Sequence, residues 1–283
     1  MDRKIAIVTD TSCDLSDEQL SEYGIELVSL RVVNSSGEYR DRLDVQPEEI
    51  YDMMKQDLPK TSLPNPGDVS ALYDSLIERG FTDVLHYALS SNLSGTFNMV
   101  RIIAEEYEGR LNVRVFDSKT LSTALGTIVL QAARDLRAGL SIDEILERST
   151  KMRQSQLGMF IIRTLEYLRK GGRIGLVEGV LGTLLQLKPI VFVNDEGIYQ
   201  TRAKARGWSS AVETMVNEMV TKFGRKAVCL SVVHGNARED AQKLLERLKT
   251  ILDVKESFIA QVSPALAIHT GPGLLGIIAS EAL

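Results

Sequence analysis

The residues best suited to chemistry in this chain are serine and threonine side chains in short polar segments. Residues 90–96, Ser-Ser-Asn-Leu-Ser-Gly-Thr, directly follow the apolar run 84–89 and precede a helical pattern that begins at Phe97. Backbone N–H groups at a helix start, together with hydroxyl groups, suit the binding of an anion such as a carboxylate or a phosphate. Ser94 can equally be a simple helix N-cap, and from this loop alone both interpretations remain open.

A second hydroxyl pair lies in a proline-rich segment. Thr61 and Ser62 are followed by Pro64 and Pro66. Proline fixes its own backbone and pushes the residue before it toward an extended conformation. We therefore expect Thr61 and Ser62 on a stiff, non-helical stretch that can present their hydroxyl groups reproducibly.

The histidines limit the catalytic and binding hypotheses, because the chain has only 3 of them. His86 lies inside the apolar run 84–89 and is expected in the core. His234 follows an apolar run and can be a site residue or a turn residue. His269 and Thr270 stand directly before Gly-Pro-Gly, so we expect His269 in a rigid loop and take it as the candidate site histidine.

The first half of the chain alternates between strand and helix patterns. We expect strand 5–8, a helix capped near Ser16, strand 25–33, a helix from Pro47, helix 69–79, strand 83–89, helix 97–107, strand 113–116, helix 121–137 and helix 141–153. Such alternation is typical of a parallel sheet with helices on both faces. Ligands of such sheets usually lie beyond the carboxyl ends of the strands, where the polar residues at Asp10, 91–96 and Asp117 are expected.

The pattern changes after about Gln156. We expect strand 159–162, helix 165–169, helix 180–185, strand 190–193, a turn at 194–197, strand 198–203, helix 209–222, strand 227–233, helix 237–252, strand 258–262 and a final buried strand after the glycines at 271–276. The turn at 194–197 predicts a β-hairpin. We therefore predict an α/β protein of two domains: residues 1–156, with a parallel sheet covered by helices on both faces, and residues 157–283, a mixed α/β domain with antiparallel pairing.

Composition narrows the function further. The formal net charge of -5 gives no general attraction to nucleic acid. The 2 cysteines lack the CxxC spacing of a metal or redox site, so we expect no metal and a reducing compartment. No apolar segment is long enough for a signal peptide or a membrane span, which favours a cytoplasmic protein without stable membrane insertion.

The sequence contains neither of the two common nucleotide-binding motifs. Residues 271–276 satisfy Gly-x-Gly-x-x-Gly, but a dinucleotide motif needs an acidic residue about twenty positions later, and the sequence ends at Leu283. No Gly-x-x-x-x-Gly-Lys-Ser/Thr segment is present either. We expect no cofactor, and any phosphoryl transfer would need a nucleotide bound by another protein.

A hydrolase is the alternative hypothesis. Ser94 and His269, with Asp10 or Asp117, could supply the nucleophile, base and orienting acid of a serine esterase or a lipase-like enzyme. The chain lacks the Gly-x-Ser-x-Gly motif of such enzymes, because the glycine expected before Leu93-Ser94 is missing. We therefore favour a binding protein without catalytic residues of its own.

Taken jointly, these segments resemble the DegV family, the bacterial fatty-acid-binding proteins that serve as the acyl carrier subunit of fatty acid kinase. The resemblance spans nearly the whole chain and rests on the order and spacing of several motifs. They are Thr9-Asp10 with Asp14-Leu15, Thr61-Ser62 with Pro64 and Pro66-Gly67, Ser90-Ser91-x-Leu93-Ser94-Gly95-Thr96, Asp117-Ser118, Leu165-Glu166-Tyr167-Leu168 with Gly171-Gly172-Arg173-Ile174, Lys188-Pro189-Ile190, and His269-Thr270-Gly271-Pro272-Gly273.

The resemblance implies a long-chain fatty acid, such as palmitate, in a tunnel between the two domains. Its carboxylate would be held by Thr61, Ser62, Ser94 and His269, with Gly95, Thr96 and Thr270 as the supporting loop. The residues expected to shape the tunnel are Leu63, Phe97, Met99, Phe160, Ile162 and Leu266. Burial of a chain of about 16 carbons could gain on the order of 10 kcal/mol, at roughly 0.8 kcal/mol for each CH₂ group.

The resemblance also implies a partner and a task. A separate fatty acid kinase would dock, around Arg173 and Arg202, and phosphorylate the presented carboxylate to an acyl phosphate for phospholipid synthesis. Uncharged donors would orient the carboxylate and leave one oxygen free to attack, whereas a tightly paired arginine would weaken that oxygen as a nucleophile. We therefore expect a pocket of uncharged donors.

Overall fold

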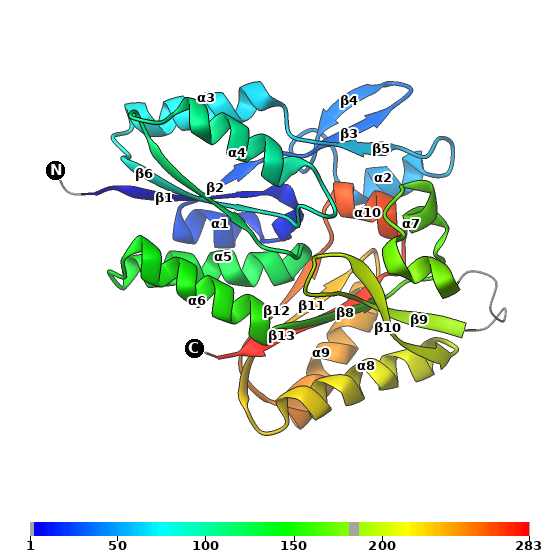
Figure 1. The fold of residues 1–283 in the computed structure, drawn as a ribbon. Coiled ribbons are helices and arrows are strands. Elements are labelled where there is room, and N and C mark those ends of the chain that lie inside the picture. Colours follow the sequence, from blue (N-terminus) through cyan, green and yellow to red (C-terminus); the bar gives the residue numbers. More distant parts are fainter. Residues whose placement is uncertain (1–2, 181–186, 283) are drawn as a thin grey trace.

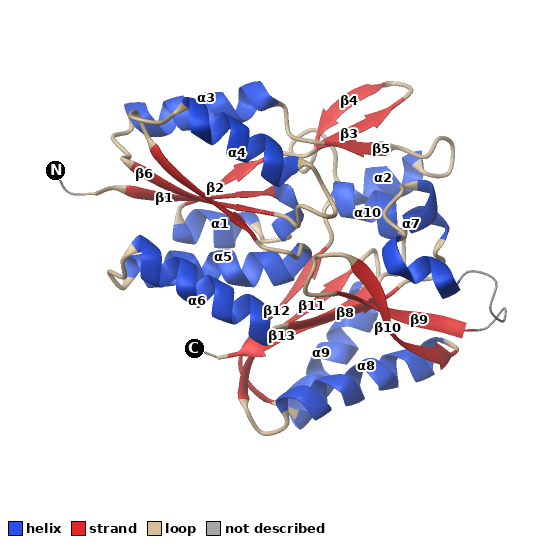
Figure 2. Cartoon of the chain, viewed as in Figure 1, coloured by secondary structure: helices blue, strands red, loops and turns tan. Residues whose placement is uncertain are grey.

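The chain folds around three β-sheets in a computed structural model that describes residues 3–180 and 187–282 (Figures 1 and 2). The elements of the first half are β1 (Ile5–Asp10), η1 (Thr11–Cys13), α1 (Asp17–Tyr23), β2 (Ile25–Val28), β3 (Arg31–Asn34), β4 (Gly37–Arg40), α2 (Pro47–Met53), β5 (Lys60–Ser62), α3 (Pro66–Glu78), β6 (Asp83–Ala88), α4 (Thr96–Glu106), β7 (Asn112–Asp117), α5 (Ser122–Arg137) and α6 (Ile142–Ser155). Those of the second half are β8 (Leu157–Ile161), α7 (Glu166–Lys170), η2 (Gly175–Val180), β9 (Leu187–Val193), β10 (Tyr199–Arg206), α8 (Trp208–Phe223), β11 (Ala227–His234), α9 (Arg238–Ile251), β12 (Asp253–Gln261), α10 (Pro264–Thr270) and β13 (Leu275–Glu281).

The first half contains a four-stranded sheet in the order β2-β1-β6-β7. All of its neighbouring strands pair in parallel. Helices α3 and α4 cover one face, and α1, α5 and α6 lie on the other (Figure 1). The buried strand β6 carries the loop 90–96 at its carboxyl end. The predicted parallel sheet with helices on both faces is confirmed.

The single strand predicted for 25–33 is wrong, because this stretch forms two strands that belong to different sheets. Strand β2 joins the parallel sheet, and β3 pairs antiparallel with both β4 and β5. The chain bends between them at Ser29 and Leu30, where the Leu30 backbone N–H donates to Thr11 Oγ1 at 3.1 Å. An unbroken run of strand-forming residues does not reveal such a bend, since the bond that holds it comes from a distant segment. The small sheet positions Thr61 opposite Val32.

The second half contains a six-stranded mixed sheet in the order β10-β9-β8-β13-β11-β12. The predicted hairpin joins β9 to β10, and within the described part of this six-stranded sheet only β11 and β12 pair in parallel. Strand β13 lies between β8 and β11, which confirms a buried strand after the glycine turn. The helix predicted for 180–185 lies outside the described residues, except for Val180 at the end of η2.

Helix α10 replaces the rigid loop that the sequence analysis expected around His269, so that expectation is wrong. Every residue of α10 is buried, from Pro264 at its first turn to Thr270. A helix that is buried on all sides has no polar face, and the 3.6-residue periodicity that identifies surface helices is therefore missing. Helix α10 packs against α2, β3 and β5 of the first half and α7 of the second.

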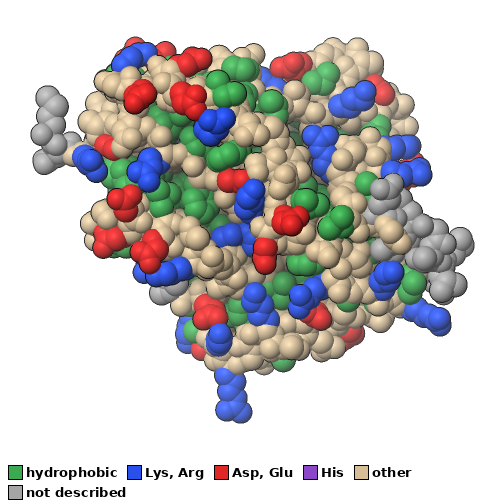
Figure 3. All heavy atoms as spheres, viewed as in Figure 1, with side chains coloured by type: hydrophobic (Ala, Val, Ile, Leu, Met, Phe, Trp, Pro, Cys, Tyr) green, Lys and Arg blue, Asp and Glu red, His purple; other side chains and the backbone are tan. Residues whose placement is uncertain are grey.

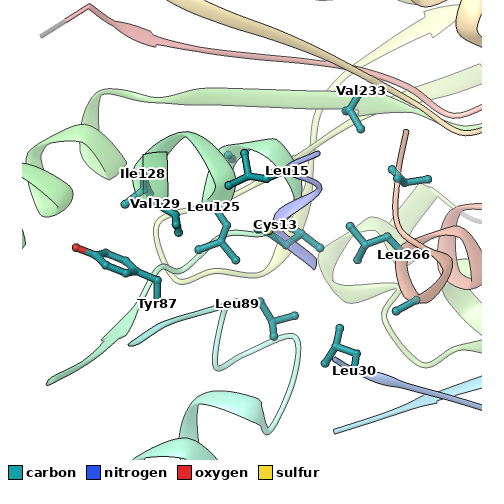
Figure 4. Close-up of a cluster of buried hydrophobic side chains, with 14 of the residues drawn as sticks. Cys13, Leu15, Leu30, Tyr87, Leu89, Leu125, Ile128, Val129, Val233 and Leu266 are labelled. Atoms are coloured by element: carbon teal, nitrogen blue, oxygen red, sulfur yellow. The ribbon is translucent and has the colours of Figure 1, made fainter. Parts of the chain in front are cut away.

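One hydrophobic core extends across both halves. Val233 and Leu266 from the second half lie in the same cluster as Cys13, Leu30 and Leu125 from the first (Figure 4). A second cluster fills the space between the mixed sheet and helices α8 and α9. The domain boundary predicted near 156 falls between α6 and β8, and the shared core fixes the two sides of that boundary against each other.

We expect Gly126 to be essential for the contact between α5 and η1. A Cβ atom at this position would lie 2.5 Å from the Cys13 carbonyl oxygen and 2.9 Å from a Leu15 methyl group. Gly126→Ala should therefore lower the free energy of unfolding by about 1–3 kcal/mol, although alanine is the better helix former. Urea unfolding measures this. Gly179→Ala is the matched control, because a Cβ there has no atom within 4 Å; equal midpoints for the two variants would contradict the prediction.

The surface carries mixed charge. On the face drawn in Figure 3, Lys and Arg side chains are interspersed with Asp and Glu side chains. Within residues 3–180 and 187–282, no helix is long and apolar enough to cross a bilayer. The same residues form no cluster of His, Cys, Asp and Glu that could hold a metal ion.

Candidate functional site

A pocket of about 220 Å³ brings together all four side chains predicted to bind a carboxylate. Thr61 and Ser62 come from β5, Ser94 from the loop before α4, and His269 from α10. We call this the donor pocket. Its other lining residues are Leu30, Leu63, Leu89, Leu93, Leu121, Arg173, Tyr199, Ala265 and Leu266. Both halves of the chain therefore contribute to it, as predicted.

His269 and Thr61 form the hydrogen bond that links the two halves within the donor pocket. Their Nε2 and Oγ1 atoms are 2.9 Å apart, and the His269 side chain is only 8% exposed. Burial, and then the positive charge of Arg173, lower the pKa of His269 to about 4, so the imidazole is neutral at neutral pH. If Nε2 carries the proton, it donates a hydrogen bond to Thr61 Oγ1. The Thr61 hydroxyl group can then point its own hydrogen toward a ligand.

Gly171 leaves the space that His269 occupies. A Cβ atom at position 171 would lie 2.2 Å from His269 Nδ1, which is far inside contact distance. Among the described residues, Nδ1 has no hydrogen-bond partner. The glycine after α7 is thus required by a close approach rather than by its backbone conformation.

Ser94 has a capping role as well as a place in the donor pocket. Its Oγ accepts a hydrogen bond from the Thr96 backbone N–H at 3.3 Å and lies 2.9 Å from Thr96 Oγ1. The loop is also anchored to the second half, because Ser90 donates its hydroxyl hydrogen to the Gly197 carbonyl at 2.8 Å. Gly95 lies against Leu63 of the donor pocket. Thr270 does not line this pocket and donates to the Leu266 carbonyl.

The geometry does not assemble a catalytic triad. No hydrogen bond joins Ser94 to His269 in the described structure, since their partners are Thr96 and Thr61. Asp10 accepts hydrogen bonds from Ser12 and from the Leu89 backbone. Asp117 accepts hydrogen bonds from the backbone N–H groups of Ser91 and Lys119. Neither carboxylate therefore orients His269, and nothing in this arrangement favours the hydrolase hypothesis.

Arg173 lies in the donor pocket, and the expectation of a wholly uncharged pocket is not met. Its Nη1 donates to the Gly171 carbonyl at 2.8 Å, and its Nε lies 3.4 Å from the Leu93 carbonyl oxygen. The sequence placed it in a basic stretch, which usually marks a solvated face. Arg202 is elsewhere: it pairs with Glu218 at 2.8 Å and does not line this pocket.

An apolar cavity of about 310 Å³ adjoins the donor pocket. Leu121, Tyr199 and Leu266 line both spaces. The other apolar residues around the cavity are Ala124, Leu157, Met159, Phe160, Phe192, Val193, Val233, Val262, Leu274 and Ile278. A polar pocket that adjoins an apolar cavity of this size suits a ligand with an anionic head and a hydrocarbon tail.

The predicted tunnel residues divide into two groups. Leu63 lines the donor pocket, Phe160 lines the apolar cavity, and Leu266 lines both. Phe97, Met99 and Ile162 line neither space. Leu121 and Tyr199 are the contacts that sequence reasoning missed, because only tertiary packing distinguishes them from other buried apolar residues.

The remaining histidines lie outside the site. His86 is fully buried, lies 2.7 Å from the Tyr73 hydroxyl, and has its pKa lowered to about 3 by burial; its predicted core position is confirmed. His234 is buried at the end of β11 and accepts a hydrogen bond from the Ala237 backbone through Nδ1. It acts as a turn residue at the start of α9.

Comparisons with known proteins agree with this geometry. Residues 4–282 match the family model described as "Uncharacterised protein, DegV family". A DegV domain-containing protein of Clostridium acetobutylicum is 36% identical over 275 residues, covering 97% of this chain and 98% of that protein. A second such protein, from Clostridium perfringens, is 35% identical over the same shares of both chains.

Solved structures match over nearly the whole chain. A DegV family protein from Thermus thermophilus, described by its fatty acid binding, superposes with a TM-score of 0.92 at 33% identity, covering 99% of this chain and 100% of its own. DegV from Bacillus subtilis, described as a fatty acid binding protein, gives 0.90 at 27% identity, with the same coverage. A stearic-acid-binding protein from Eubacterium ventriosum gives 0.88 at 27% identity, with 98% of both chains covered.

Proposed function

The chain belongs to the DegV family, and we propose that it binds a long-chain fatty acid such as palmitate. In this proposal the carboxylate lies in the donor pocket and the hydrocarbon tail in the apolar cavity. The observation that carries it is the shared lining of Leu121, Tyr199 and Leu266, which places the donor pocket and the apolar cavity side by side. Relatives of the same fold that are described as fatty acid binding proteins support the same ligand class.

The tail would supply most of the affinity. At roughly 0.8 kcal/mol for each buried CH₂ group, a tail of about ten buried methylenes gains around 8 kcal/mol before ordering costs are subtracted. The head group then needs orientation more than binding energy. Thr61, Ser62 and Ser94 would donate hydroxyl hydrogens, and Arg173 would add one charged donor.

We further propose that the protein is not an enzyme but the lipid carrier of a separate fatty acid kinase. A carboxylate oxygen would attack the terminal phosphoryl group of a nucleotide held by that kinase, and the nucleoside diphosphate would leave. The product is an acyl phosphate for phospholipid synthesis. Of the two arginines first assigned to docking, Arg202 remains the candidate because it is exposed, and it also lines the apolar cavity; Arg173 lines the donor pocket.

Lipid extraction tests the binding proposal. The protein should be purified from its host, denatured and extracted, and the extract analysed by mass spectrometry for fatty acids. We expect close to one bound fatty acid for each chain. A protein that carries none, and that binds no palmitate after delipidation, would overturn the proposal. Turnover of ester substrates by the protein alone would instead support the hydrolase alternative.

The carrier proposal needs its own experiment. The loaded protein, a fatty acid kinase and Mg-ATP should give an acyl phosphate, which hydroxylamine traps as a hydroxamate. Arg202→Glu should slow this reaction about tenfold at low ionic strength, because it reverses the charge of the proposed docking residue. An unchanged rate would remove Arg202 from the docking surface.

Thr61→Val should weaken fatty acid binding by about tenfold, because it removes a hydroxyl donor to a charged group and leaves His269 without its partner. The two side chains have nearly the same volume, so the fold should persist. Titration calorimetry with palmitate measures the change. Thr214→Val, at a partly exposed position of α8 that lines neither pocket, is the control. Equal affinity of Thr61→Val and the unaltered protein would remove Thr61 from the carboxylate site.

A further inference from the structure

The apolar cavity is polar on the side that does not border the donor pocket. The polar residues that line the cavity but not the donor pocket include Gln154, Asp195 and Arg202. Three others are Gln156, Arg153 and Lys222. They come from the end of α6, the residue that joins it to β8, and the last turn of α8. A slot that serves only a hydrocarbon tail would be expected to end among apolar side chains.

Arg153 and Lys222 are two cations on this side that donate hydrogen bonds to uncharged backbone carbonyl groups. Arg153 donates to the carbonyl oxygens of Ser118, Lys119 and Asn194 at 3.1, 3.0 and 2.8 Å. Lys222 Nζ donates to the Gln156 backbone carbonyl at 3.0 Å. In the described part of the chain, neither cation forms an ion pair with a carboxylate. Burial lowers the pKa of both side chains. The Asp195 carboxylate lines the same cavity and offsets part of this effect, but no ion pair joins it to either cation among the described residues. Lone pairs of a ligand would therefore be favourable beside them.

The carbonyl oxygen of the Gln156 side chain, Oε1, accepts no hydrogen bond among the described residues. Its Nε2 donates to the Ala124 carbonyl at 3.0 Å and to Thr127 Oγ1 at 2.8 Å. Because a carbonyl oxygen only accepts, the amide nitrogen must face Ala124, and Oε1 must point the other way. The residue is 7% exposed, and its Oε1 has no hydrogen-bond partner among the residues described. A buried acceptor of this kind is costly unless something donates to it.

We propose that the slot selects fatty acids that carry a hydroxyl group on the part of the chain that reaches Gln156. The hydroxyl hydrogen is donated to Gln156 Oε1, and the hydroxyl oxygen accepts from the ammonium group of Lys222, which has further hydrogens to give. A methyl group or a methylene in the same place forms no hydrogen bond with Gln156 or with Lys222. This inference rests on the proposed fatty acid binding and names its substrate class.

The test compares matched ligands. The delipidated protein is titrated with saturated fatty acids of about twelve to eighteen carbons and with the ω-hydroxy acid of each length. In a wholly apolar slot, the hydroxy acid binds at least about tenfold more weakly at every length, because its hydroxyl is buried without partners. We expect instead that the hydroxy acid binds about threefold or more tightly at one or two lengths, since Gln156 lies at a fixed distance from the donor pocket.

The outcomes separate this inference from the proposed function. Hydroxy acids that are weaker at every chain length overturn the inference and leave fatty acid binding intact. If neither series binds at any length, the proposed function itself fails. A preference for the hydroxy acid at a particular length supports both.

Two variants identify the residues responsible. Gln156→Leu should abolish the preference for the hydroxy acid, but it also breaks the bonds to Ala124 and Thr127 and can impair folding. Lys222→Met keeps the aliphatic stem, removes only the ammonium group, and should lower the affinity ratio of hydroxy acid to plain acid at least about threefold. Lys226→Met is the matched control, because Lys226 pairs with Glu281 outside the cavity. A ratio that Lys222→Met and a folded Gln156→Leu both leave unchanged overturns the inference.

Discussion

Ala124→Phe should reduce fatty acid binding at least a hundredfold while the chain remains folded. Ala124 lies on α5, is 5% exposed, and lines the apolar cavity. A benzyl group there fills space that the proposed ligand needs for about four or five methylenes, and each excluded methylene forfeits roughly 0.8 kcal/mol. The new side chain enters an existing cavity, so the fold should lose little stability.

The measurement combines ligand titration with thermal unfolding of the delipidated variant. Ala138→Phe is the matched control, because it adds the same ring at the exposed end of α5. It should bind palmitate as the unaltered protein does. If Ala124→Phe is folded and binds palmitate normally, the tail lies elsewhere and the assignment of the cavity fails.

Arg173→Met should weaken fatty acid binding by about 10- to 100-fold, because a charge-assisted hydrogen bond to a carboxylate contributes on the order of 1.5–3 kcal/mol. Methionine keeps most of the aliphatic length of arginine, so the packing around the Leu93 loop changes little. The matched control is Arg169→Met on the exposed side of α7, which should leave affinity unchanged. Equal affinities for both variants would place the carboxylate away from Arg173.

The same variant should change the titration of His269. Burial and Arg173 hold its pKa near 4, below the ordinary 6.5. Because the unfolded chain binds this proton more readily, the neutral His269 contributes its full share to the free energy of unfolding above pH 6.5. That contribution is lost as the pH falls from 6.5 toward 4. In Arg173→Met, the pKa of His269 should rise, although burial still keeps it below 6.5. NMR titration of the ring protons measures the shift, and an unaltered pKa would contradict the electrostatic influence of Arg173 on His269.

Much of the fold could be predicted because its signals are local. The apolar run 84–89, the helix starts at Ser16 and Ser141, and Pro47 each mark an element boundary that the structure reproduces. The helix predicted from residue 69 begins three residues earlier, at Pro66. The failures have tertiary causes. The bend between β2 and β3 depends on a hydrogen bond from Leu30 to Thr11, and α10 has no polar face from which to infer a helix.

The same contrast between local signals and tertiary packing applies to the candidate site. Thr61, Ser94 and His269 could be chosen as candidates from their polar segments and from the family resemblance, although His269 lies in a helix and not in the loop that was expected. The position of Arg173 could not, since a basic stretch after a helix gives no sign of which cation turns inward. The continuity of the two pockets through Leu121 and Tyr199 arises from packing between distant segments.

The place of β13 in the middle of the mixed sheet has a consequence for synthesis on the ribosome. Residues 275–281 pair with β8 on one side and β11 on the other, so β8 emerges early and keeps an open edge until the final strand is translated. The parallel sheet of the first half faces no such delay, because its last strand ends at Asp117. His269 and Leu266 of α10, which line the donor pocket, also follow most of the chain in sequence, so the donor pocket is incomplete until α10 has been translated.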